Sequence, residues 1–298
     1  MAIIHHFVKF SAPGSRCHAL LGSVLGLLLV FRTNTAYNRF WEGRKIWEKV
    51  LSVGRDFSRF TVVFSDAMPQ SRLERILHLL CVFPIVLQEH VQGFHQKQAL
   101  KEHLSDEEIA CINQVTNKPF FVTCKLSSEV RAIATAPGVF SDRERQTMLK
   151  YADDLSDCIG ACERIVQTPV PLSYARHTSR FLTLFCLTAP VALVNEIGAG
   201  IVPFVTLMSW CLFGIQEIGF MIEDPFQGAL RLEIFANTIR RDISDLLHIT
   251  KVSASPLSIT TPSLGYEVPF YCRIQQRGVQ TPSPLEESSF SNFFSPST

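Results

Sequence analysis

The sequence predicts an all-α integral membrane protein, a helical bundle that continues into an aqueous helical extension. Of the 298 residues, 47% are hydrophobic and 18% are charged, and the mean hydropathy is +0.17. This composition is apolar for a soluble protein but too polar for a transporter of many spans. Two of the apolar windows form a hairpin joined by the short loop 195–200. A soluble bundle whose core helices supply the same windows is the alternative.

The apolar windows set the order of the elements, and they lie at residues 18–31, 73–88, 181–194 and 201–222. Only the last approaches the roughly 20 apolar residues that a lipid-exposed helix needs. The others either gain length from snorkelling neighbours such as Arg32 and Arg180 or lie inside a bundle, shielded from lipid. The chain then divides into five segments, expected at residues 1–17, 18–91, 92–176, 177–252 and 253–298.

The first window runs directly into a cationic block, which we define as residues 32–59 and which holds seven Lys and Arg residues. The loop 195–200 holds none. The positive-inside rule therefore places the cationic block on the cytoplasmic side of a membrane or, in a plastid, on the stromal side.

Three residues of the first window, Ser23, Leu27 and Phe31, recur every four positions and so share one helix face. Ordinary helix packing explains such a row. Alternatively, the row lines a narrow pore, since apolar rings can gate by dewetting and phenyl edges carry partial positive charge. Because one short helix cannot enclose a pore, this second interpretation requires several subunits around one axis.

The segment 92–176 is more polar and is expected to lie outside the membrane. Ser105 with Glu108, and Ser141 with Glu144, have capping-box spacing, which predicts that a helix begins at each serine. The second of these helices is predicted to be amphipathic and to pack on others through one apolar stripe. The stripe consists of Leu149, Ala152, Leu155, Ile159, Cys162 and Val166.

Two prolines flank Val170 in the stretch TPVPLSYAR and end the amphipathic helix. This stretch is either a turn that returns the chain to the membrane or a turn that presents Val170 as a second constriction. The last apolar window ends in QEIGFMIEDPF, with acids at Glu217, Glu223 and Asp224. Acids at a membrane boundary need partners, so we expect structural salt bridges within the bundle. The expected partners are Arg39, Arg44 and Lys45.

Enzyme motifs are absent from the sequence: it has no Gly-rich phosphate loop, HExxH, GxSxG or Asp-rich calcium loop. The net charge of +1 argues against a nucleic-acid-binding protein. Most of the nine cysteines lie in apolar runs and are interpreted as small buried hydrophobic residues. Cys158 and Cys162 lie one helical turn apart, but no second pair at zinc-like spacing accompanies them. No catalytic residue, cofactor or metal is predicted.

The tail, residues 253–298, is rich in Ser, Thr and Pro and has no periodicity. We expect it to be largely disordered. Its scattered aromatic residues leave open that part of it docks on the aqueous region.

Three ordered motifs, LLLVFRTNTAYNRFWEGRKIW, TPVPLSYARHTSRFLTLFCLTAP and CLFGIQEIGFMIEDPF, resemble the bestrophin family of anion channels, in particular its plant chloroplast, algal and bacterial branch. The resemblance implies a homopentamer around one axial pore that passes small monovalent anions such as chloride or bicarbonate, in contact with membrane lipid. It places the pore neck on Ser23, Leu27 and Phe31 and a second aperture on Val170. For a photosynthetic source it implies the thylakoid membrane. The structural interface implied between the motifs comprises Arg39, Trp41, Glu42, Arg44, Glu217, Glu223, Asp224 and Pro225.

The chain departs from the family pattern in three places. No carboxylates follow Pro225, so the calcium gating of the animal members is not expected. Ser23 stands where an apolar residue is usual, which predicts a wetter neck. Family members carry a membrane helix ahead of the pore helix, whereas 17 residues precede His18 here, so the expectation is a truncated N-terminus. The alternative function is a non-conducting membrane scaffold or regulatory subunit of such a channel, and a soluble enzyme comes third.

Overall fold

The computed structural model describes residues 14–93, 97–136 and 138–253. Within these ranges the chain is helical with short connections, and no strand is formed, which confirms the all-α prediction. The predicted tail and most of the predicted N-terminal segment lie outside the described residues. The elements are α2 (Gly14–Val63), η1 (Ser65–Ala67), α3 (Gln70–Gln92), α4 (Lys97–Lys101), α5 (Asp106–Gln114), α6 (Lys118–Arg131), α7 (Asp142–Gln167), α8 (Leu172–Ile197), η2 (Gly198–Gly200), α9 (Ile201–Glu223), η3 (Pro225–Ala229) and α10 (Leu232–Ser253).

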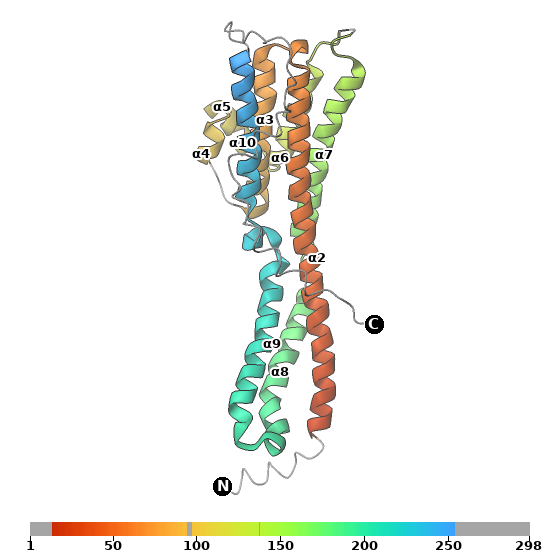
Figure 1. Cartoon of the computed structure of the whole chain (residues 1–298), viewed down its shortest axis with the longest axis vertical. Coiled ribbons are helices and arrows are strands. Elements are labelled where there is room, and N and C mark those ends of the chain that lie inside the picture. Colours follow the sequence, from red (N-terminus) through yellow and green to blue (C-terminus); the bar gives the residue numbers. More distant parts are fainter. Residues whose placement is uncertain (1–13, 94–96, 137, 254–298) are drawn as a thin grey trace, which may run out of the picture. The chain divides into compact units, whose positions relative to one another are not determined.

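Helix α2 is a single helix of 50 residues, and its sequence contains no proline that would interrupt it. Its first half holds the apolar window and its second half holds most of the cationic block. At about 1.5 Å per residue the helix is about 75 Å long, more than twice the roughly 30 Å of a bilayer core. One helix therefore packs against α8 and α9 in its first half and against α7 and α10 in its second half (Figure 1).

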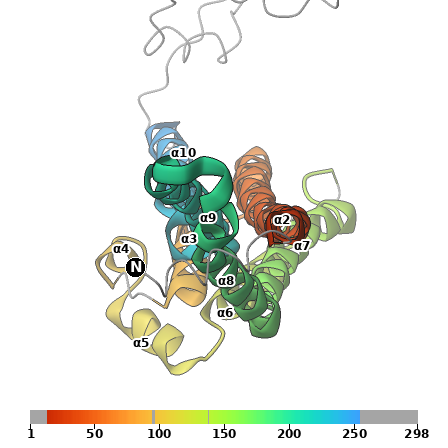
Figure 2. The ribbon, with the colours of Figure 1, turned by 90° about the horizontal axis from the view of Figure 1, so that it is seen from below.

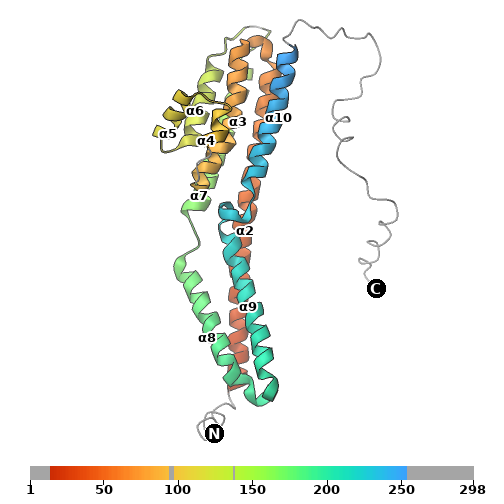
Figure 3. The same ribbon diagram turned by 90° about the vertical axis from the view of Figure 1, so that its left-hand side faces the viewer.

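The membrane bundle, defined here as the first half of α2 with α8 and α9, contains the helices that are long and apolar enough to cross a membrane. Among the described residues there are three such helices, namely α2, α8 and α9. Helices α8 and α9 pack along the first half of α2 (Figures 1 and 3). They form the predicted hairpin, in which Gly198 ends α8 with a positive φ of 63° that favours glycine.

The aqueous bundle consists of the second half of α2 together with α3, α6, α7 and α10 (Figure 1). The short helices α4 and α5 lie at its outer edge (Figure 2). Helix α3 buries 15 of its 23 residues and is not among the candidate membrane spans. For the window 73–88, the structure therefore has the second of the two alternatives, a helix shielded inside a bundle.

The predicted helix starts in the aqueous bundle are confirmed. The Ser105 and Ser141 side chains cap α5 and α7, and each forms the reciprocal capping box with the glutamate three residues on. The apolar face of α7 is slightly rotated from the prediction, because Met148 and Ile165 are buried whereas Val166 is exposed.

Candidate functional site

The predicted neck row lies on the open face of α2. Ser23 is exposed, and Leu27 and Phe31 are 56% and 54% exposed. On the opposite face of the same helix, Leu25 and Leu29 are buried in a small cluster with two residues of α8. The row is therefore covered neither by α8 nor by α9, and its uncharged side chains are free to face a neighbouring copy or a pore.

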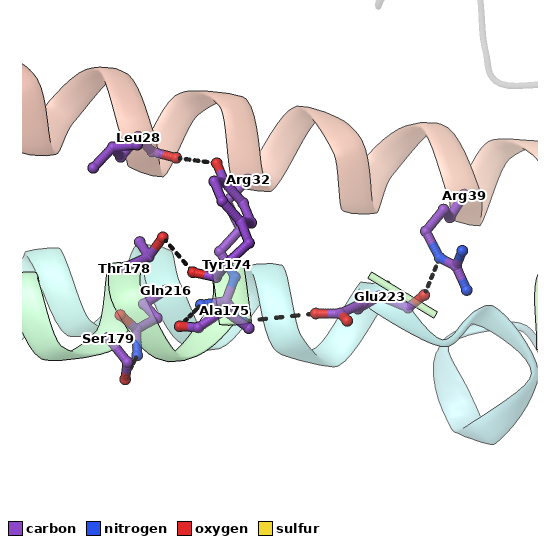
Figure 4. A network of polar contacts seen from close by, with 9 residues as sticks. All are labelled: Leu28, Arg32, Arg39, Tyr174, Ala175, Thr178, Ser179, Gln216 and Glu223. Atoms are coloured by element: carbon purple, nitrogen blue, oxygen red, sulfur yellow. Dashed lines mark hydrogen bonds and ion pairs between the residues drawn. The ribbon is translucent and has the colours of Figure 1, made fainter. Parts of the chain in front are cut away.

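Behind the row, a buried cation connects the three membrane helices (Figure 4). Arg32 directly follows Phe31 but is only 2% exposed. Its Cζ atom lies 3.8 Å from the centroid of the Phe220 ring on α9. Its Nη2 atom lies 3.6 Å from Oε2 of Glu223, and Nη1 donates to the carbonyl oxygen of Ala175 on α8 at 3.5 Å. The side chain therefore contacts both other helices of the membrane bundle.

Further polar contacts cross the membrane bundle beside Arg32 (Figure 4). The Tyr174 hydroxyl on α8 donates to the carbonyl oxygen of Leu28 on α2 at 3.3 Å. The Gln216 amide on α9 donates to the Ser179 hydroxyl on α8 at 3.0 Å. The buried Thr178 hydroxyl donates within α8 to the carbonyl oxygen of Tyr174. Each pair of neighbouring helices is thus joined by at least one polar contact.

The buried polar atoms of this network are incompletely satisfied. Nε and Nη2 of Arg32 and Oε1 of Gln216 are buried and have no hydrogen-bond partner in the described structure. In a medium of low dielectric constant, such groups interact strongly with any charge nearby, because water does not screen them.

Arg39 joins the membrane bundle to the aqueous bundle. Its Nε donates to the carbonyl oxygen of Glu223 at 3.0 Å, and its two terminal nitrogens donate to the carbonyl oxygens of Thr168 and Ile165, each at 2.7 Å. These carbonyls belong to the C-terminal ends of α9 and α7, where helix carbonyls lack intrahelical partners and the dipole favours a cation. The guanidinium therefore ties α2 to both helix ends.

This geometry differs from the predicted pairing of the acids. From the sequence, Arg39, Arg44 and Lys45 are predicted to neutralise the acids that end α9. In the structure, Arg39 binds the backbone of Glu223, and it is Arg32 that forms an ion pair with the Glu223 carboxylate. Arg32 is not among the predicted partners, because the sequence leaves two alternatives for it, snorkelling outward or lying inside the bundle. Its position three residues after Leu29, on the buried face of α2, was the signal available in the sequence.

Other predicted interface residues contact α7 or the turn between α9 and α10. The Glu42 carboxylate forms an ion pair with Arg164 of α7. Asp224 accepts a hydrogen bond at 3.2 Å from the backbone N–H two residues later. A Cβ atom at Gly43 would lie 3.0 Å from Cγ of Pro225, so α2 and η3 approach as closely as only a glycine allows.

The remaining predicted interface residues do not join this contact. Trp41 is about half exposed, and the Lys45 ammonium lies 5.9 Å from its ring centroid. Arg44 pairs with Glu48 of the same helix at 3.2 Å. Glu217 is exposed and has no ion pair among the described residues.

Val170 lies in the connection between α7 and α8 and is partly exposed. As predicted, the flanking prolines separate two helices, and Pro171 stands at the N-cap of α8. The Arg39 hydrogen bond to Thr168 fixes the start of this connection. Val170 therefore lies two residues after a carbonyl that the guanidinium joining the two bundles holds.

Metal-binding geometry is not found within the described ranges, where no three His, Cys, Asp or Glu residues gather around one point. Burial raises the pKa of the Cys158 thiol to about 11 and raises that of Cys162 as well. Both thiols stay protonated and behave as small apolar groups in the core of α7.

Comparison with known proteins places these features in one family. A family model described as bacterial/fungal bestrophin protein matches residues 2–245. A voltage-dependent anion channel-forming protein of Synechocystis is 33% identical over 247 residues, which cover 81% of this chain and 80% of the relative. Voltage-dependent chloride channel 1, chloroplastic, of Arabidopsis thaliana is 30% identical, over 79% of this chain and 57% of the relative. The crystal structure of a bacterial bestrophin homolog from Klebsiella pneumoniae aligns with a TM-score of 0.74 at 27% identity, over 78% of this chain and 87% of that chain.

Proposed function

The chain belongs to the bestrophin family, and from this premise we propose that it is a membrane anion channel that conducts as a homopentamer around one axial pore. The observation that carries this proposal is the row of Ser23, Leu27 and Phe31, which is uncharged and open on α2 while the opposite face of the helix is buried. The names of the relatives support channel activity and not catalysis.

Five copies of the row would form three rings, each about 6 Å from the next, because four residues advance a helix by that distance. The Leu27 and Phe31 rings form a hydrophobic neck that closes by dewetting, and the phenyl edges face a passing anion with partial positive charge. The Ser23 hydroxyl, which donates to the carbonyl oxygen of Ala19 at 3.2 Å, makes the outermost ring wetter. Anions then move down their electrochemical gradient.

Val170 forms the second constriction of the proposed pathway. Its side chain is apolar and partly exposed at a turn held by Arg39. A ring of such side chains selects between anions by size and by the water they must lose. The exposed cations of the cationic block raise the local anion concentration at the aqueous end.

The proposed ions are chloride and bicarbonate, and the proposed location is the thylakoid membrane. Support for a plastid comes from relatives named as chloroplastic. Support for lipid contact comes from α9, whose exposed side chains include Val202, Trp210 and Met221.

Planar-bilayer recording of the purified protein in asymmetric potassium chloride tests the channel. A particle of about five 33.5 kDa protomers with a reversal potential near the chloride equilibrium value is the expected result. Substituting bicarbonate on one side then ranks the two anions. Silence from a particle smaller than a pentamer would favour the non-conducting scaffold instead.

Phe31→Ala tests the neck. Removing the phenyl ring widens the narrowest apolar level, so conductance or leak should rise. Phe204→Ala on α9 is the matched control, since Phe204 is 47% exposed and lies outside the row. Equal currents in wild type and Phe31→Ala would remove this residue from the pore.

Val170→Ala tests the aperture. We expect it to change the permeability ratio between chloride and larger anions more than the open probability, because it widens a passage without altering the neck. A ratio identical to that of wild type would contradict the assignment.

A further inference from the structure

The lining of the proposed neck carries no formal charge. Apart from the partial positive charge on the Phe31 ring edges, a preference for anions at this level must therefore come from groups behind the residues that line the pore. Arg32 follows Phe31 by one residue and is therefore rotated by about 100° around α2, toward the buried side. A helix is about 10 Å across, so this cation lies within about one helix diameter of the proposed pathway.

We propose that the Arg32–Glu223 ion pair sets the preference for anions over cations at the neck. Arg32 supplies the dominant positive charge, and the Glu223 carboxylate partly offsets its potential. This inference rests on the proposed function. It concerns groups that do not line the pathway and that act on the ion through the helix wall.

The two charges of the pair are screened unequally. The Arg32 side chain is 2% exposed, whereas that of Glu223 is 21% exposed. A charge surrounded by protein and lipid acts over a longer distance than one that reaches water. The atoms Nη2 and Oε2 are 3.6 Å apart, an ion pair without a hydrogen bond, so the two opposite charges are separated in space and do not cancel at every point around them. A net positive potential remains at the level of Phe31.

The cation is held in place and does not snorkel to water. Its guanidinium lies on the Phe220 ring and donates to the carbonyl oxygen of Ala175. Gly219 faces it across the contact, since a Cβ atom there would lie 4.0 Å from Nε of Arg32. Packing from α8 and α9 therefore fixes the charge beside the neck (Figure 4).

Opposite effects of two neutralising substitutions distinguish this charge effect from a structural role. Arg32→Met removes the positive charge and should lower the ratio of chloride to potassium permeability. Glu223→Gln removes the opposing negative charge and should raise the ratio of chloride to potassium permeability. If the pair only held the helices together, both substitutions would move the ratio in the same direction or leave it unchanged.

Reversal potentials in asymmetric potassium chloride measure the ratio. A change of about threefold or more in each direction is expected for a poorly screened charge at this distance. Arg240→Met and Glu102→Gln are the matched controls, because Arg240 of α10 and Glu102, in the turn after α4, form an Arg–Glu ion pair outside the candidate membrane spans. They should leave the ratio unchanged.

The double variant Arg32→Met/Glu223→Gln keeps the test decisive if a single variant fails to assemble, because it leaves no unpaired buried charge. Its permeability ratio should fall below that of wild type, since the net positive potential is lost, and a ratio equal to wild type would overturn the inference. A conducting, anion-selective wild type whose ratio is unchanged by all three variants would overturn the charge-pair proposal alone. A silent wild-type pentamer would overturn the proposed function itself.

Discussion

The two halves of α2 are packed differently: the second half lies in a large apolar core, whereas the first half contacts few buried apolar residues. In the aqueous bundle, Trp47, Val50 and Phe57 are buried in one large apolar core that also takes in α3, α7 and α10. In the membrane bundle, the buried apolar cluster is reduced to four residues of α2 and α8. They are Leu25, Leu29, Leu182 and Cys186.

The difference extends to the helices that pack on α2. Helix α3 buries most of its residues, whereas the buried residues of α9 are Gln216 and Gly219. Water drives apolar side chains into the core of the aqueous bundle. Lipid supplies no such force, so helices there associate through polar contacts and close approach of small residues. The aqueous bundle thus forms its own apolar core, while the membrane bundle leaves much of its apolar surface exposed in the single chain.

Two tryptophans give the largest test of this contrast. Trp47 is 0% exposed in the aqueous core, and Trp210 is 74% exposed on α9. Trp47→Ala should lower the free energy of unfolding by about 3–5 kcal/mol, because it opens a cavity. Trp210→Ala should change it by no more than about 0.5 kcal/mol. Denaturant unfolding in detergent measures both, and equal losses would contradict the contrast.

Arg39→Lys tests the junction of the two bundles. Lysine cannot reproduce the planar fork that reaches three carbonyl oxygens, so two charge-assisted hydrogen bonds should be lost, with a cost of about 2–3 kcal/mol. Arg44→Lys is the control, since Arg44 pairs with Glu48 of the same helix and lies over the Phe235 ring of α10, a contact within the aqueous bundle. A loss at Arg39 no greater than at Arg44 would show that the bundles are joined elsewhere.

A half-buried histidine, His103, makes the aqueous bundle sensitive to pH. Burial, with the nearby His78 and Arg240, lowers the pKa of His103 from 6.5 to about 4. The unfolded chain therefore binds a proton between pH 6.5 and 4 while the folded chain does not, so the free energy of unfolding falls as pH falls through this window. Allowing for partial exposure, the change is about 1 kcal/mol.

His103→Gln should flatten that dependence, whereas His248→Gln, at an exposed position of α10, should keep it. Thermal unfolding between pH 7 and 4 measures the slope. An identical slope in both variants would assign the pH sensitivity to other groups.

The smallest effect is expected at an exposed ion pair. Arg44 and Glu48, 36% and 66% exposed, lie one turn apart on α2 at 3.2 Å. Glu48→Gln should cost about 0.3–0.5 kcal/mol and less at high salt. The same substitution at Glu223 should cost several times more, because it leaves Arg32 buried without a counter-charge. Similar losses of unfolding free energy at Glu48 and Glu223 would mean that burial does not decide how much each ion pair contributes.

Structure is predicted correctly from the sequence where it depends on a local pattern of residues. The Ser105 and Ser141 caps, the proline break at Val170 and the α8–α9 hairpin each depend on residues close together in the chain. The window 73–88 stayed between two alternatives, because an apolar helix has the same composition whether lipid or other helices surround it.

The Arg32 network could not be predicted in detail for a related reason. Its direction depends on Phe220 and Ala175, which are more than 140 residues away in sequence and meet Arg32 only after α8 and α9 have packed. The roles of Ser23, Leu27, Phe31 and Val170 depend on further copies, so they stay predictions.

Because α2 is continuous, a movement at its aqueous end is coupled mechanically to a movement at its far end. Arg39, where α2 is tethered to the ends of α7 and α9, stands near the midpoint of the 50-residue helix. A stiff rod of about 75 Å that pivots there converts a tilt of about 2° into a displacement of about 1.3 Å at each end. In the proposed pentamer, a small lateral push on the aqueous end of each rod would therefore change the diameter at the far end by about 2.6 Å, close to the size of a water molecule.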